Sequence, residues 1–134
     1  MEDVIKLTNL SENYSVFELA ENYLSKNKKK ISKILNENNF VNEECILILR
    51  TILNRSKRLL KLKESQSQTG NIDLTLSSYK PPIFWKEKDI VKKQIQVWSD
   101  DEVKKMIRKL SDLEILIKKN SNNSLNFVSD FVSN

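Results

Sequence analysis

The chain's two prolines stand side by side at Pro81 and Pro82, and its single glycine is Gly70. Each proline ring fixes φ and removes a backbone donor, and the residue before a proline is pushed away from helical geometry. Turn-rich β folds need far more glycine and proline than this chain of 134 residues contains. The sequence therefore predicts an all-α protein whose helices are interrupted at Pro81–Pro82.

Bulky apolar residues follow the proline pair at helical spacing. Phe84, Val91, Ile95 and Trp98 recur at offsets that place them on one stripe of an α-helix. We expect this helix to run from about Ile83 to Trp98. Its stripe needs a groove, which the other helices must supply.

Further helices are indicated by caps and apolar periodicity. Capping boxes occur at Ser15–Glu18 and Ser99–Glu102, and Asn27 can end one helix and start the next. A polar stretch at 64–71, which holds the only glycine, is expected to be a loop. We predict a single orthogonal bundle of about six or seven helices, spanning residues 14–134. Residues 1–13 have no helical period and are interpreted as an extended lead-in or linker from a missing upstream module.

The helix expected from Asn42 to about Lys63 is the longest and most apolar. Its first half is aliphatic nearly all round, which predicts a central position. Its second half is basic, with Arg55 and Arg58 among lysines. Such a face is either solvated or in contact with a subunit or nucleic acid.

Several classes of chemistry lack their usual residues. With one cysteine, Cys45, and no histidine, an internal disulfide, a cysteine-based zinc site and histidine catalysis are excluded. No nucleotide-binding or nucleophile motif is present. Asp100, Asp101 and Glu102 could be imagined as a magnesium site, but they suit the positive end of a helix. We therefore predict no catalytic, cofactor-binding or metal-binding residues.

The charge and hydropathy of the chain bear on its surroundings. Lysine and arginine exceed aspartate and glutamate by 23 − 18 = 5, a balance compatible with nucleic acid nearby. No apolar run approaches the roughly 18 residues that a membrane helix needs, and the N-terminus does not resemble a signal peptide. We expect a cytoplasmic protein with no membrane partner.

Residues 42–65 (NEECILILRTILNRSKRLLKLKES) and 80–120 (KPPIFWKEKDIVKKQIQVWSDDEVKKMIRKLSDLEILIKKN) carry a family resemblance. Together with residues 5–40, they resemble the C-terminal part of the delta subunit of the bacterial DNA polymerase III clamp loader. The Pro-Pro-aromatic version of the junction is similar to alphaproteobacterial members.

The resemblance implies a collar-type domain, the helical segment by which clamp-loader subunits assemble into a ring. It implies delta-prime and gamma/tau subunits as partners, and contact with the sliding clamp and DNA only through the full-length subunit or complex. The family's delta subunit belongs to the DNA polymerase III holoenzyme, a nucleotidyltransferase, but this segment has no expected catalysis or cofactor of its own.

An isolated ring segment would leave two faces for neighbours. Apolar residues on more than one side of a helix, and a tryptophan that follows Phe84 directly, mark candidate positions. The subunit-interface candidates are Leu47, Ile48, Arg55, Arg58, Trp85, Ile115 and Leu116. The alternative function is a free-standing basic helical domain that binds nucleic acid.

Overall fold

The longest helix, α3, runs from Asn42 to Thr69, and five other helices pack against it. We describe a computed structural model that covers residues 2–80 and 82–133, with side chains from Asn13 onward except that of Ser121. Every described element is helical, and the described residues form no strand. The prediction of an all-α bundle of six or seven helices is confirmed. The elements are α1 (Glu2–Leu24), α2 (Lys28–Glu37), α3 (Asn42–Thr69), α4 (Ile72–Ser78), the 3-10 turn η1 (Trp85–Glu87), α5 (Lys88–Val97), α6 (Asp100–Lys119), the 3-10 turn η2 (Ser121–Asn123) and α7 (Ser124–Ser133).

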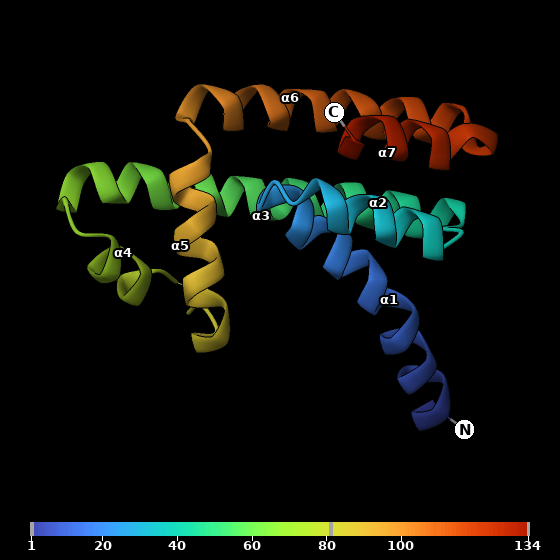
Figure 1. Cartoon of the computed structure of the whole chain (residues 1–134), viewed down its shortest axis with the longest axis horizontal. Coiled ribbons are helices and arrows are strands. Elements are labelled where there is room, and N and C mark those ends of the chain that lie inside the picture. The colour runs from blue at the N-terminus through green and yellow to red at the C-terminus, as the bar shows by residue number, and fades with distance from the viewer. Residues whose placement is uncertain (1, 81, 134) are drawn as a thin grey trace.

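The central position of α3 follows from its apolar spacing. Ile48, Ile52, Leu59 and Leu62 repeat every three, four or seven residues, so they share one broad face, and all four are buried. In Figure 1, α6 runs antiparallel along α3, whereas α5 crosses α3 at a steep angle. The core therefore lies between α3 and the helices around it.

The corner between α5 and α6 is fixed by polar contacts. Ser99 caps α6 by accepting a hydrogen bond from the Glu102 amide, and the Glu102 carboxylate accepts one from the Ser99 amide. Lys63 of α3 donates to the Ile95 carbonyl at 3.0 Å and pairs with Asp100. The capping box expected at Ser99–Glu102 is confirmed, and it sets where α5 turns into α6.

The N-terminal prediction is wrong in two respects. Residues 1–13 were expected to be extended and a helix was expected to begin at Ser15, but α1 begins at Glu2 and Ser15 lies inside it. Neither proline nor glycine occurs between Glu2 and Leu24, so no backbone constraint ends the helix. The first half of α1 projects away from the other helices, which explains why it needs no apolar stripe (Figure 1). The link to an upstream module stays a prediction.

Two other boundaries differ from expectation. The segment 64–71 is not a loop, because α3 continues to Thr69 and ends only at Gly70, whose φ is 69°. Glutamate and glutamine sustain a helix, and a left-handed glycine ends it. The helix expected from Ile83 to Trp98 is shorter, since η1 precedes α5. Pro81 lies outside the described residues, but Tyr79 and Phe84 on either side are non-helical, as the proline pair predicts.

Candidate functional site

An aromatic corner lies between the proline pair and α5. Phe84 ends the extended segment, and η1 begins at Trp85, so the two rings leave the chain at a bend. Trp85 is 70% exposed and Phe84 is 57% exposed. Their ring centroids lie 6.0 Å apart, and the Lys86 ammonium lies 5.5 Å from the Trp85 ring. Phe84 therefore does not join Val91 and Ile95 in the buried stripe, because the bend at η1 takes it out of helical register.

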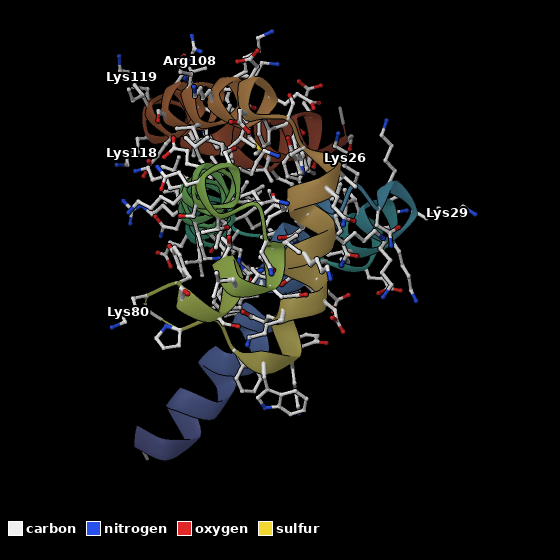
Figure 2. All side chains as sticks on the ribbon, turned by 90° about the vertical axis from the view of Figure 1, so that its left-hand side faces the viewer. Lys26, Lys29, Lys80, Arg108, Lys118 and Lys119 are labelled. Carbon is white, nitrogen blue, oxygen red and sulfur yellow. The ribbon has the colours of Figure 1, made fainter. Side chains whose placement is uncertain are left out.

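The outward side of α6 carries a second exposed apolar position. Ile115 is 54% exposed on the face opposite the buried Leu110 and Ile117. Figure 2 shows Arg108 and Lys119 extending outward from the same helix. Leu116 is 45% exposed but lies one residue round the helix, where it borders the groove described below.

The other four interface candidates are buried, or paired with other residues of the chain, to different degrees. Ile48 is fully buried in the core, so it offers no surface to a partner, and Leu47 is partly buried beside it. Arg55 pairs with Glu21 of α1, and Arg58 lies 3.9 Å from Glu87 of η1. Of the seven candidates, the structure leaves Trp85, Ile115 and Leu116 largely exposed. These three do not form one cluster, since Trp85 begins η1 and the other two lie near the far end of α6 (Figure 1).

A groove of about 660 Å³ opens between the α1–α2 turn, α6 and α7. Its floor is aromatic: the Tyr23 ring centroid lies 5.9 Å from that of Trp98 and 5.1 Å from that of Phe131. The Trp98 indole donates to the Leu24 carbonyl at 2.7 Å, which fixes the plane of the ring. Further apolar lining comes from Ile31, Met106, Leu113, Leu116, Phe127 and Val132.

Charged side chains surround this floor. Lys26, Lys28, Lys105 and Lys109 line the groove together with Glu102, Asp112 and Asp130. The Lys26 ammonium lies 4.4 Å from the centre of the Trp98 ring and 3.5 Å from Glu102 (Figure 2 shows Lys26 beside the α5–α6 junction). Hydrogen bonds from Ser99, and then the charge of Lys26, lower the pKa of Glu102. Glu102 is therefore an ionised carboxylate that is already satisfied within the chain.

Burial sets the ionisation of two further groups. It raises the pKa of Tyr23 to about 12, so the phenol stays neutral at physiological pH. No hydrogen bond joins the Tyr23 hydroxyl to another described residue. Burial, and then Glu44, raises the pKa of the Cys45 thiol to about 11. Cys45 is thus a small core hydrophobe, as its aliphatic neighbours predict.

Sequence reasoning did not identify the groove. Trp98 was expected on a helix stripe, and it is half-buried, as is Tyr23. Tyr23, Trp98 and Phe131 are far apart in the chain, so only the fold brings them together. The available signal was the chain's large aromatic side chains, because short helices cannot enclose every ring completely.

The described residues contain no metal-binding cluster and no helix suited to crossing a membrane. No group of three or more histidine, cysteine, aspartate or glutamate side chains in this part of the chain could hold a metal ion. None of the described helices has the combination of length and apolarity that crossing a bilayer requires.

Comparison with protein-family models, curated proteins and solved structures found no match.

Proposed function

We propose that this chain is a non-catalytic subunit-assembly domain, the collar domain of a clamp-loader delta-type subunit that helps to load the sliding clamp in bacterial DNA replication. The proposal rests on the resemblance of residues 42–65 and 80–120 to that family. It names the other clamp-loader subunits, of delta-prime and gamma/tau type, as partners and places the protein in the cytoplasm.

The structural observation that supports an assembly role is the placement of the exposed bulky side chains. Phe84 and Trp85 are exposed just before α5 begins. Ile115 is exposed on the outward face of α6, near the C-terminal end of that helix. A ring segment touches a neighbour on each side, so it needs apolar surface in two separate places. Tryptophan is enriched among the residues that dominate binding energy, which favours Trp85 as an anchor.

The alternative is a free-standing basic helical domain that binds nucleic acid, motivated by the basic charge balance and the lysine-rich helices. In the basic second half of α3, Arg55, Arg58 and Lys63 are each paired with a carboxylate of this chain, whereas Lys57 and Lys61 are exposed. Arg50, earlier in the helix, pairs with Glu114. These cations form ion pairs between α3 and its neighbours, so they are only partly available to bind the phosphates of a nucleic acid.

The test mixes the purified chain with clamp-loader subunits of delta-prime and gamma/tau type and follows the complex by size-exclusion chromatography with light scattering. We expect a complex with the unmodified chain and at least about tenfold weaker binding for Trp85→Ala, as for an interface anchor. Because the Trp85 ring is mostly exposed, its loss should change the stability of the free chain by no more than about 0.5 kcal/mol.

Lys29→Ala provides the matched control, since Lys29 is exposed on α2 and forms no ion pair with a described residue (Figure 2). It should bind like the unmodified chain. Absence of any complex at micromolar concentrations would refute the proposal. Salt-sensitive binding of the chain to DNA, with no binding to the subunits, would favour the alternative.

A further inference from the structure

We propose that the groove between the α1–α2 turn, α6 and α7 docks an acidic amphipathic helix of a partner protein. The helix would place its apolar side chains on the aromatic floor and its carboxylates against Lys105 and Lys109. This inference goes beyond the assembly function and does not depend on the family assignment. It rests on the shape, the floor and the charge pattern of the groove.

The shape and floor suit a bulky apolar ligand. A volume of about 660 Å³ lies within the range of sites that enclose small molecules or several side chains. Tyr23, Trp98 and Phe131 present ring faces and edges that lose little conformational freedom on binding. The neutral Tyr23 hydroxyl adds a polar group that can bond to a peptide. An apolar helix face lying in such a groove is a recurrent mode of peptide recognition.

The charge pattern along α6 selects an acidic ligand. Glu102, Lys105, Lys109 and Asp112 follow one another at helical spacing along the wall of the groove. Glu102 pairs with Lys26 at 3.5 Å, whereas Lys105 and Lys109 form no ion pair with a described residue. Lys28 lines the groove from α2, again without an ion pair to a described residue. The middle of this wall, at Lys105 and Lys109, therefore attracts the carboxylates of a ligand.

The acids of the groove distinguish a peptide from a polyanion. Asp112 and Asp130 also line it, and Asp112 lies one helical turn beyond Lys109. A nucleic acid carries charge along its whole length and would meet these carboxylates. A peptide helix can place its glutamates only opposite the lysines, so the mixed pattern favours the peptide.

The experiment uses Trp98 as a reporter, because it lies in the floor of the groove. Trp85→Phe leaves Trp98 as the only tryptophan. The probe is a tryptophan-free synthetic peptide of about four helical turns. It has leucines on one face and a pair of glutamates beside them. We expect a saturable change in Trp98 fluorescence, and at least about tenfold weaker binding when Lys105 and Lys109 are both changed to glutamate.

The matched control changes Lys104 and Arg108 to glutamate, which alters the charge equally on the outward face of the same helix. This variant should bind within about threefold of the parent, because long-range attraction is largely screened at 0.15 M salt. A peptide of the same composition with its leucines scattered should not bind. Circular dichroism checks that each variant is folded.

Any one of the following results would overturn the inference: no saturable change with the probe, equal binding of the scattered peptide, or equal weakening by both charge changes. Tighter binding of an oligothymidylate than of the peptide would also overturn it and assign the groove to nucleic acid. The chain is tested alone here. Failure would therefore leave the assembly proposal untouched, and failure to bind clamp-loader subunits would leave the groove untouched.

Discussion

Ile48 and Ile115 show how burial separates two similar residues. Both are isoleucines on long helices, and both were candidates for a subunit interface. Ile48 is fully enclosed between α3 and its neighbours, whereas 54% of Ile115 is exposed. The same side chain is therefore part of the core in one place and available surface in the other.

This difference predicts opposite outcomes for truncation. Ile48→Ala removes buried methyl groups and leaves a cavity, so it should lower the free energy of unfolding by about 2–5 kcal/mol. Ile115→Ala should change it by less than about 0.5 kcal/mol. Urea denaturation followed by circular dichroism measures both. Similar losses for the two variants would contradict the assigned burial.

At the scale of elements, helix ends depend on single residues. α3 continues through the polar residues 64–69 and stops at Gly70, whose amide donates to the Gln66 carbonyl at 2.8 Å. Gly70 has a backbone φ of 69°, which residues other than glycine rarely adopt. Nothing lies within 4 Å of the position where a Cβ would be added. Only backbone strain therefore opposes substitution there.

Gly70→Ala should accordingly destabilise the protein by about 1 kcal/mol, the cost of left-handed geometry for an ordinary residue. Gly70→Asn should cost less, because asparagine tolerates this conformation better. Thermal unfolding of the three proteins should rank them glycine, asparagine, alanine. Equal stability of the glycine and alanine forms would show that α3 does not end in this geometry.

The sequence was sufficient for helix starts with local caps and insufficient for the projecting part of α1 and for the groove. Asn27 and Ser99 have local partners three residues away, so their helix starts could be recognised. The first half of α1 projects from the bundle (Figure 1), and its sequence has no apolar period. The exposure of Trp85 could be suspected from its neighbour Phe84, but the groove around Trp98 depends on residues more than seventy positions apart. Such contacts have no local signature.

At the scale of the whole molecule, one polar junction joins three helices. Glu21 of α1 pairs with Arg55 of α3 and accepts a hydrogen bond at 3.0 Å from the Gln94 amide of α5. All three side chains are largely screened from solvent, and Gln94 is 3% exposed. Removing one partner would leave the others without full compensation. This contact uses an arginine that sequence alone placed at an interface.

A double-mutant cycle tests the junction. Glu21→Gln and Arg55→Met should each destabilise the chain by about 1–3 kcal/mol, since each leaves a partly buried polar group unsatisfied. The double variant should lose less than the sum, with a coupling energy of at least about 0.5 kcal/mol. Additive losses, measured by urea denaturation, would mean that the two residues act separately.

Two carboxylates of α6, Glu102 and Glu114, have a lowered pKa, which predicts that the fold becomes less stable in acid. The Arg50 guanidinium donates to Glu114 at 2.8 Å and, with Lys118, lowers the pKa of that carboxyl below its ordinary value of 4.5. The pKa of Glu102 is lowered by Ser99 and Lys26. A group whose pKa is lower in the folded state contributes stability above its unfolded pKa. That contribution is lost as the pH falls through the folded value, because protonation breaks the pairing.

We therefore expect the urea midpoint to be level near pH 7 and to decrease as the pH falls below about 4.5, where unfolded carboxyls take up protons. Glu114→Gln cannot be ionised, so it should start lower at pH 7 and decline less steeply in acid. Glu64→Gln is the control, because Glu64 is exposed and forms no ion pair with a described residue. An acid decline that is unchanged in Glu114→Gln would show that this pair does not attach α6 to α3, and the fold would then depend on apolar packing alone at that contact.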